Sequence, residues 1–386
     1  MTTTLQRVRE LAPSIRQRSA EIEMARRLPL DLVGELKAAG CFRMFVPAEY
    51  GGDELTYHQA CQVLEELASA DGSTGWTTMI GSETPILLSR LPRRTFETVY
   101  ADGPDVIGAG ALAPKGQAVV VEGGYCLSGQ WSFASGCQHA SWLLGQATLT
   151  ENGRPRISPA GVPEMRVAVF PAAQAEILDS WHVAGLQGTG SHDFRVQDAF
   201  CSDEWTFNML TSPPSVQSAA YAIPLLIQLP AKIAAVALGI AQGALDDIAA
   251  LASMGKRRVF APSRLAESAV FQDTLGEADA TLRAARALFY TDLDAAWAMA
   301  NRGEALSQLE RARMRTMATH VAVAAARVVD IAYTAGGGSA VYEASPLQRR
   351  LRDIHTLTQH IGVARDTFAY AGALLAGESL DPRIPV

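Results

Sequence analysis

The hydrophobic pattern changes its period twice along the chain, and this change constrains the fold more than any other feature. Up to about residue 105, apolar side chains recur every three or four positions, as they do on one face of a helix. Short β-rich runs split by glycines follow to about residue 212, and helical spacing then returns. The sequence therefore predicts an α+β protein with an N-terminal helical domain (1–105), a middle antiparallel β-barrel or sandwich (106–212) and a C-terminal four-helix bundle (213–386).

Individual elements can be placed within the first two regions. Spacings of three and four from Leu5 to Ile15 mark one face of a first helix. A second helix is expected to begin at Pro29 and to stop at Gly40, and a third covers Tyr57–Ala70. In the β region, the letters EGG between Val121 and Tyr125 predict a hairpin turn.

The third region predicts four long helices. Apolar steps of three and four run from Phe271 to Phe289, from Met317 to Ile331 and from Leu347 to Ala364, and a fourth helix is expected from Lys232 to Ser253. Residues 231–300 contain 21 alanines, small side chains that let helices approach closely.

Composition excludes several classes of protein. Charged residues make up only 19% of the 386 residues and the net charge is −7, so a nucleic-acid partner is not expected. The five cysteines form no CxxC pair, and the seven histidines show no spacing with acidic residues that is typical of a metal site. The N-terminus lacks the apolar core of a signal peptide, and no uncharged window of membrane type is expected, so the predicted location is cytoplasmic, with no membrane partner.

Six segments then occur in an informative order. They read VPAEYGG, LEELASADGSTGW, LSGQWSFASGCQHASW, WHVAGLQGTGSHDFRVQD, GKRRVF and LQRRLRDIHTLTQH. This series resembles the acyl-CoA dehydrogenase superfamily over nearly the whole chain, from about residue 10 to 378. The resemblance implies a flavin cofactor and assembly of the bundles into a homotetramer, which would account for the low charge of the nominal surface.

Two branches of this superfamily compete: the dehydrogenases and the two-component flavin-dependent monooxygenases. A dehydrogenase needs a carboxylate base, and the resemblance places it either after the RD of the last helices or early in the first bundle helix. Ile361 occupies the first place, and the second, IQLPAKIAAVALG, contains no carboxylate. Ile361 also fits the apolar stripe of its helix, so we expect it to be buried there and to face the substrate. The absence of a carboxylate base at both places argues against dehydrogenation.

The monooxygenase branch matches better. Its members carry a histidine after the RD, which His360 matches, and a W-x-F-x-S-G-x-x-H segment, which Trp131 to His139 matches. The resemblance implies that His360 and Ser135 are catalytic and hold the flavin peroxide. Trp131, Ser132, Phe133 and Ala134 are expected along the flavin ring, although Trp131 and Phe133 also suit a plain strand core. His355 lies on another face of the helix.

The remaining site candidates are less specific. The glycine-rich loop GLQGTGSHD offers Thr189 and Ser191 to a flavin phosphate, or forms a simple tight turn. The resemblance implies further flavin contacts, made across a subunit interface, at Arg257, Phe260, Gln272, Gly337 and Gly338. Substrate-binding candidates are Trp76, His139 and Ile361; His139 either lines the cavity or caps the turn. The altered phosphate loop, LAPKGQA, leaves FAD and FMN both open.

These observations predict the oxygenase component of a two-component flavin monooxygenase. It would take reduced flavin (FAD or FMN) from a separate flavin reductase and hydroxylate an aromatic or polyketide-like small molecule with O2. One alternative is a dehydrogenase of acyl-CoA or acyl-carrier-protein thioesters with FAD and an atypical base. A second alternative is a non-catalytic scaffold member of the fold.

Overall fold

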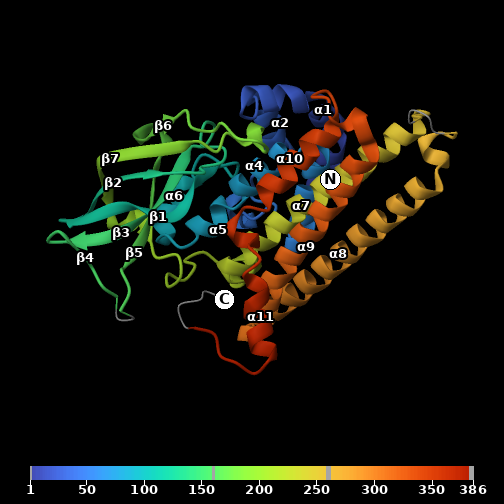
Figure 1. The fold of residues 1–386 in the computed structure, drawn as a ribbon. Coiled ribbons are helices and arrows are strands. Elements are labelled where there is room, and N and C mark those ends of the chain that lie inside the picture. Colours follow the sequence, from blue (N-terminus) through green and yellow to red (C-terminus); the bar gives the residue numbers. More distant parts are fainter. Residues whose placement is uncertain (1, 159–160, 258–261, 382–386) are drawn as a thin grey trace.

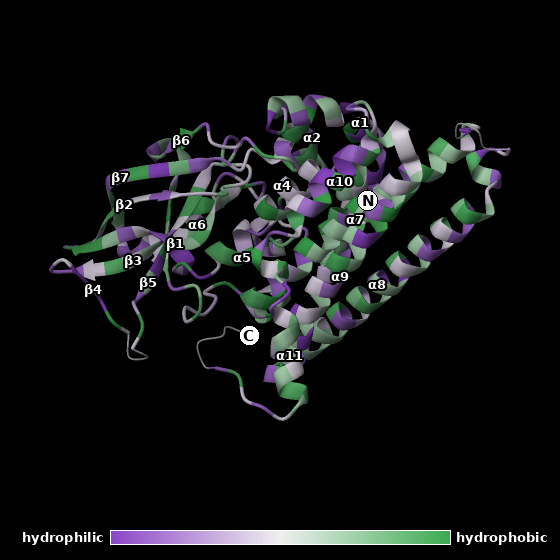
Figure 2. Ribbon diagram, viewed as in Figure 1, coloured by the Kyte–Doolittle hydropathy of each residue, from purple (hydrophilic) through white to green (hydrophobic). Residues whose placement is uncertain are grey.

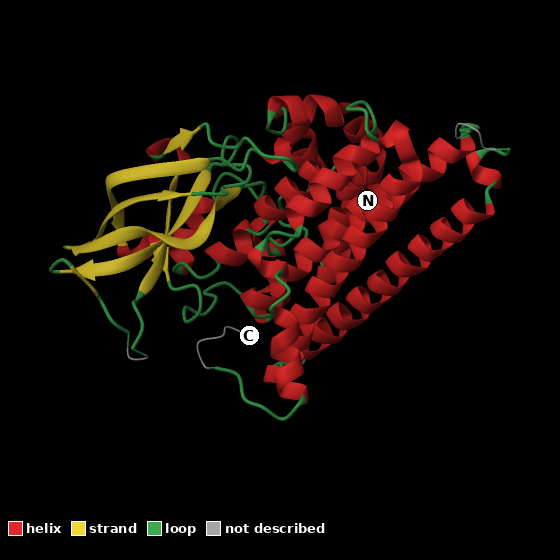
Figure 3. Ribbon diagram, in the orientation of Figure 1, coloured by secondary structure: helices red, strands yellow, loops and turns green. Residues whose placement is uncertain are grey.

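Helices and strands occupy different parts of the molecule (Figures 1 and 3). The structure, a computed structural model, describes residues 2–158, 161–257 and 262–381. The strands form one end of the molecule, and the bundle helices form the other end. The helices that precede the sheet are α1 (Thr4–Ala25), α2 (Leu30–Ala39), α3 (Tyr57–Ala70), α4 (Gly72–Ser82), α5 (Thr84–Leu88) and α6 (Arg93–Val99).

The first three helices have clear local causes and confirm the sequence prediction. Thr3 and Thr56 form capping boxes at the starts of α1 and α3, which satisfy backbone N–H groups that would otherwise lack partners. Helix α2 follows Pro29 and ends at Gly40, whose φ of 94° suits glycine and closes the last turn. Helix α3 has the predicted bounds, Tyr57–Ala70.

Helix α4 has no counterpart in the sequence prediction. Its sequence, GSTGWTTMIGS, is rich in residues with low helix propensity, and ten of its eleven residues are buried. A helix buried on all sides shows no amphipathic period, so the pattern that reveals its neighbours is missing here. The helix lies between the sheet and the bundle (Figure 1), where it positions Trp76.

Eight strands form a single sheet in the order β6-β7-β2-β1-β3-β5-β8, with β4 paired to β3. The turn at Glu122–Gly123 joins the first two strands, as the sequence predicts. The strands are β1 (Gly108–Val121), β2 (Gly124–Trp131), β3 (Trp142–Glu151), β4 (Arg154–Pro155), β5 (Met165–Pro171), β6 (Glu176–Leu178), β7 (Asp193–Ser202) and β8 (Thr206–Phe207).

The prediction of a purely antiparallel β domain is wrong at one pair, because β1 and β3 run parallel. Strand β2 returns to the end of the sheet where β1 began, since the two form a hairpin. The loop 132–141 contains no strand, so β3 starts at that same end and runs beside β1 in the same direction. This loop carries Phe133 and Ser135 across the end of the sheet.

The C-terminal helices form the predicted bundle with one difference in length. Helix α8 lies on the outer side of the bundle (Figure 1), and polar and apolar stretches alternate along it (Figure 2), as one buried face requires. The helices are α7 (Leu225–Ser253), α8 (Ala269–Asn301), α9 (Gln308–Gly336), α10 (Pro346–Leu357) and α11 (Thr367–Leu375). Helix α10 ends at Leu357, so the predicted continuation to Ala364 is wrong.

Helix α7 is long and apolar enough to cross a membrane by length and composition alone, although charged residues interrupt it at Lys232 and Asp246. Of this apolar window, 83% is buried inside the protein. The helix contacts α3, α9 and α10, and nearly every side chain from Ala231 to Ala241 is buried. Its apolarity is therefore that of a core helix, which other helices surround.

Candidate active site

Ser135 lies where the loop after β2 meets α4. The indole Nε1 of Trp76 donates a hydrogen bond to Ser135 Oγ at 3.0 Å, so the helix fixes the position of the hydroxyl. Only 5% of Ser135 and 7% of Trp76 are exposed. Asp71 caps α4 by accepting the backbone N–H of Thr74, which holds the first turn of the helix that carries Trp76.

Three hydroxyl groups are joined in a row at this point. Ser135 Oγ lies 2.7 Å from Ser191 Oγ, which in turn lies 2.6 Å from Thr189 Oγ1. Thr189 donates to the carbonyl oxygen of Leu186 at 2.8 Å. Thr189 and Ser191 are buried, and their hydroxyls are bonded within this row, where they support Ser135. A contact of this loop with the flavin through its backbone N–H groups stays a prediction.

His360 also contacts Trp76. The two rings meet edge to face with centroids 5.6 Å apart, and Nδ1 of His360 accepts the backbone N–H of Gly362 at 3.0 Å. The neutral ring therefore carries its proton on Nε2, where it can act as a donor. Solvent reaches the side chain, yet protein surrounds much of the ring, and this desolvation lowers the pKa of His360 and favours the neutral form.

Ile361 corrects a specific expectation. Since α10 ends at Leu357, the chain turns through His360 and continues into a short 3₁₀ turn, Ile361–Val363. Ile361 is 80% exposed rather than buried on a helical stripe. The position that a dehydrogenase base would occupy thus holds an exposed apolar side chain. His355 bonds Asp330 at 2.8 Å and is not part of this group.

The loop and strand residues expected along the flavin ring divide into two groups. The Trp131 side chain is fully buried, donates to the carbonyl of Gln146 at 2.8 Å and stacks on Phe194, so it belongs to the core of the sheet and not to the flavin surface. Ala134 is also buried. Phe133 is 71% exposed and has a φ of 68°, a conformation that costs a non-glycine residue free energy. Ser132 bonds Asp193 beside it.

His139 belongs to the loop after β2 and is half-buried. Neither of its ring nitrogens has a hydrogen-bond partner among the described residues. Burial, together with the nearby charges of Arg27 and Lys37, lowers the pKa of His139 to about 4, so the ring is neutral. Its side chain lies close to Gly136 and Thr77, on the side of the loop that faces α4. Its role in substrate binding stays a prediction.

The candidates for contacts with the rest of the flavin lie elsewhere. Arg257 lies between α7 and α8, Gln272 lies in the first turn of α8, and Gly337 and Gly338 begin the 3₁₀ turn that follows α9. Phe260 lies outside the described residues. The segments next to these residues carry four exposed apolar side chains, each at least 67% exposed: Met254, Val270, Val341 and Tyr342.

The sequence analysis missed one residue of this region, Asp353. Its Oδ1 accepts the backbone N–H of Leu186 at 2.6 Å and so ties α10 to the loop that ends the hydroxyl row. Burial, and then the charge of Asp71, raise the pKa of Asp353 to about 7. The signal was available, since Asp353 belongs to the RD dipeptide that located His360.

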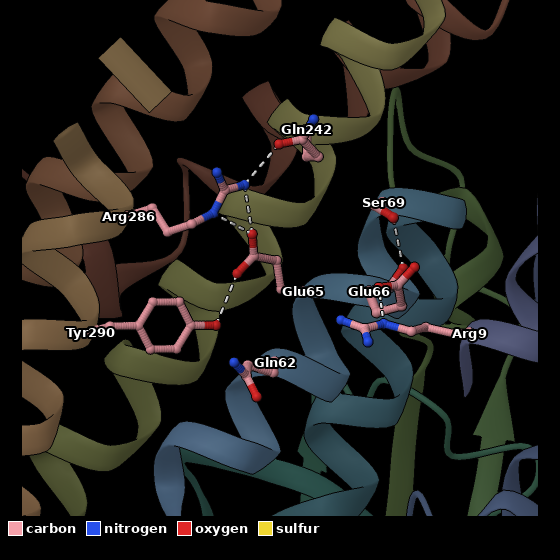
Figure 4. A pocket seen from close by; sticks show the side chains of 8 residues that line it. All are labelled: Arg9, Gln62, Glu65, Glu66, Ser69, Gln242, Arg286 and Tyr290. Atoms are coloured by element: carbon pink, nitrogen blue, oxygen red, sulfur yellow. Dashed lines mark hydrogen bonds and ion pairs between the residues drawn. The ribbon is translucent and has the colours of Figure 1, made fainter. Parts of the chain in front are cut away.

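A separate recess on the bundle holds none of the predicted site residues. It has a volume of about 200 Å³ and is lined by Arg9, Gln62, Glu65, Glu66, Ser69, Gln242, Arg286 and Tyr290 (Figure 4). Glu65 accepts hydrogen bonds from Arg286 at 2.7 Å and from Tyr290 at 2.9 Å, and Arg286 also donates to Gln242. These groups satisfy one another, which marks a structural network.

Comparison with known proteins agrees with the fold. Residues 3–89 match the N-terminal domain of acyl-CoA dehydrogenases and residues 231–365 match the C-terminal domain. The chain is 33% identical to an indole-3-acetate monooxygenase of Pseudomonas putida over 94% of its own length and 91% of the relative. It is 30% identical to the oxygenase subunit HsaA, a flavin-dependent monooxygenase of Rhodococcus jostii, over 92% and 93% of the two chains.

Solved structures give the same result. The fold matches the crystal structure of 3-HSA hydroxylase from Rhodococcus sp. RHA1 with a TM-score of 0.91, 28% identity and coverage of 98% of each chain. XiaF from Streptomyces sp., solved with FADH2 and glycerol, matches with a TM-score of 0.89 and 25% identity over 99% of this chain and 96% of XiaF. Fold and site thus define a member of the acyl-CoA dehydrogenase superfamily. Within it, the chain belongs to the flavin-dependent monooxygenases.

Proposed function

We propose that this chain is the oxygenase component of a two-component monooxygenase, which uses reduced flavin and O2 to hydroxylate an aromatic or polyketide-like small molecule. The observation that carries the proposal is the arrangement around Trp76. A buried hydroxyl, Ser135, and a neutral imidazole, His360, both contact this residue, and exposed Ile361 stands where a dehydrogenase base would be. The group can hold and move protons, but it cannot abstract one as a carboxylate does.

The residues around this group suit a flavin. Phe133 and Ile361 are large, apolar and exposed, so a flat aromatic ring system would cover surface that water otherwise contacts. Ser135 and His360 supply polar groups for the edges of such a ring. When bound, the reduced flavin, FAD or FMN, supplies the electrons that activate O2. A relative from Rhizobium is an FADH2-dependent resorcinol hydroxylase, 29% identical over 93% of this chain, which supports the same cofactor class here.

Each protein group then has a defined task. His360 donates through Nε2–H to an oxygen atom, because Gly362 occupies its other ring nitrogen. Its lowered pKa keeps the ring neutral at pH 7, so it can donate a hydrogen bond without adding a charge. Trp76 contacts both polar groups, and Trp76 and Phe133 are the aromatic walls that exclude water from the reacting oxygen. His139 contributes a polar contact for the substrate.

Partners and assembly belong to the same proposal. A separate flavin reductase delivers the reduced flavin; the words oxygenase subunit and oxygenase component in the names of two relatives support this partner. The protein acts as a homotetramer in the cytoplasm, in which Arg257, Gln272, Gly337 and Gly338 of one copy reach the flavin of a neighbour. The exposed apolar side chains near these four residues, Val270 and Tyr342 among them, would be covered in that assembly.

The test supplies the purified protein with reduced FAD or FMN, ¹⁸O2 and a panel that includes indole-3-acetate and resorcinol. We expect a hydroxylated product that carries one ¹⁸O atom. His360→Ala should lower product formation about 100-fold, with the O2 released as H2O2, because the donor that steadies the reacting oxygen is gone. His355→Ala is the matched control, since His355 bonds Asp330 away from the site.

Two outcomes would contradict the proposal. If the protein forms no labelled product with any member of the panel, and if octanoyl-CoA bleaches FAD bound to it without any reductase, the chain is a dehydrogenase. If the protein binds neither reduced nor oxidised flavin, it is a scaffold member of the fold. Equal H2O2 release by the wild type and His360→Ala would remove His360 from the proposed chemistry.

A further inference from the structure

The row of hydroxyl groups at Ser135 has a direction, and counting protons fixes it. Thr189 Oγ1 lies 2.8 Å from the carbonyl oxygen of Leu186, which can only accept, so Thr189 donates its one proton there. The contact of 2.6 Å between Thr189 and Ser191 then needs the proton of Ser191. By the same reasoning, the contact of 2.7 Å between Ser191 and Ser135 needs the proton of Ser135.

This direction leaves Ser135 as an acceptor. Its only proton is donated to Ser191, and the indole N–H of Trp76 occupies one of its two lone pairs. One lone pair of Ser135 remains without a donor among the described residues. A ligand beside Ser135 must therefore offer an N–H or O–H group, and a ligand that offers only a lone pair meets repulsion.

The fixed end of the row makes the direction stable. Leu186 has a φ of 51°, and its carbonyl oxygen also accepts the backbone N–H of Thr189 at 3.2 Å, which holds the carbonyl toward the row. Trp181 Nε1 donates to the same carbonyl at 3.1 Å. Thr189 and Ser191 are 1% and 3% exposed, so no bulk water can exchange protons with the row and reverse it.

We propose that Ser191 and Thr189 are positioning residues that hold Ser135 as a hydrogen-bond acceptor and thereby make the site prefer reduced over oxidised flavin. The inference rests on the proposed function. Reduced flavin carries a hydrogen on ring nitrogen N5, whereas the N5 of oxidised flavin has only a lone pair. A Ser135 that is free to rotate can satisfy both forms, but a Ser135 with its proton already donated satisfies only the first.

The experiment compares the dissociation constants of reduced and oxidised flavin, each measured by anaerobic calorimetry on the full chain. Ser191→Ala removes the acceptor of the Ser135 proton and lets Ser135 donate to a ligand. The ratio of the oxidised to the reduced dissociation constant should fall about tenfold, the effect of one hydrogen bond made or lost. Thr189→Val breaks the row one step earlier and should lower the ratio as well. Ser191→Thr keeps a hydroxyl and should restore the wild-type ratio.

Ser128→Ala is the matched control. Ser128, on strand β2, donates to Asp198 and is not part of the row, so the ratio of dissociation constants of this variant should equal that of the wild type. An unchanged ratio in both Ser191→Ala and Thr189→Val, with reduced flavin still bound, overturns the positioning role and leaves the proposed function intact. Failure of the wild type to bind reduced flavin at all overturns both. A fall in the ratio that Ser191→Thr reverses supports the positioning role, since mere loosening of the loop would weaken both flavins equally.

Discussion

Two buried polar clusters in this protein have different effects: one fixes the direction of its hydrogen bonds, and the other holds two helical segments together. The row from Ser135 to Leu186 is neutral, and its hydrogen bonds, with that of Trp76, measure 2.6 to 3.0 Å. In the helical core, Lys232 and Glu83 form an ion pair at 3.2 Å, with Lys232 fully buried. Among the residues that the structure describes, the ammonium group of Lys232 has no well-oriented hydrogen-bond acceptor, and it lies 5.1 Å from the ring centre of Phe45.

The difference follows from what each cluster can satisfy. Burial raises the pKa of Glu83 and lowers that of Lys232, since removal from water disfavours both charges, and only the attraction between them opposes this. The neutral row bears no such cost, because every proton has an acceptor. A row of this kind can therefore present one defined lone pair to a ligand, whereas the ion pair holds two helical segments together at a high cost of desolvation.

The largest test breaks the ion pair. Glu83→Gln leaves Lys232 as an uncompensated buried charge, and we expect it to lower the free energy of unfolding by about 3–5 kcal/mol in urea denaturation. The double variant Glu83→Gln/Lys232→Met removes the charge and should recover most of this loss. A single variant as stable as the wild type would mean that the pair is neutral in the folded protein, and the contrast between the two clusters would disappear.

The next test concerns the residue that fixes the end of the neutral row. The pKa of Asp353 is raised from 3.8 to about 7, so its protonated form is favoured in the folded state. Its stabilising contribution is complete below pH 3.8 and is lost as the pH rises to 7. The wild type should thus lose about 3 kcal/mol of unfolding free energy between pH 5 and pH 8 from this group alone.

Asp353→Asn should remove that part of the pH dependence, because its amide oxygen still accepts the N–H of Leu186 but does not titrate. The measurement is a pair of urea curves at pH 5 and pH 8 for each protein. Parallel losses in the two proteins would show that Asp353 is already ionised in the folded state at pH 5.

The smallest test removes a single neutral hydrogen bond. Trp76→Phe keeps an aromatic ring beside His360 but deletes the N–H that Ser135 accepts. We expect a loss of about 1 kcal/mol in the free energy of unfolding, well below that of Glu83→Gln. A loss as large as that of the ion-pair variant would show that the neutral row also carries much of the cohesion between sheet and bundle.

Much of the fold could be predicted because most helices here have one buried face. The bounds of α3 and the stop of α2 at Gly40 follow from periodicity and capping signals. Helix α4 could not be found, since a segment buried on all sides and rich in glycine and threonine shows neither signal. The parallel pairing of β1 and β3 depends on the path of a loop, which no local pattern encodes.

Individual residues of the candidate site could be named from the sequence, but their arrangement in space could not. His360 and Ser135 could be named from their motifs, yet their common contact with Trp76 arises only when α4, the loop after β2 and the end of α10 meet. The exposure of Ile361 could not be foreseen, because the apolar spacing continues past the point where α10 ends. The roles of Thr189 and Ser191 likewise depend on hydrogen bonds that sequence spacing does not reveal.

The proposal that Arg257 reaches the flavin of a neighbouring copy, while Ser135 serves the site of its own chain, has a genetic consequence. In the proposed assembly, each chain contributes half of one site and the other half of a neighbouring site. A substitution that spoils one half would then damage sites in which the rest of the residues come from an intact copy. In a cell that makes both versions of the protein, the defective version would be dominant, and its harm would grow with its share of the mixed tetramers.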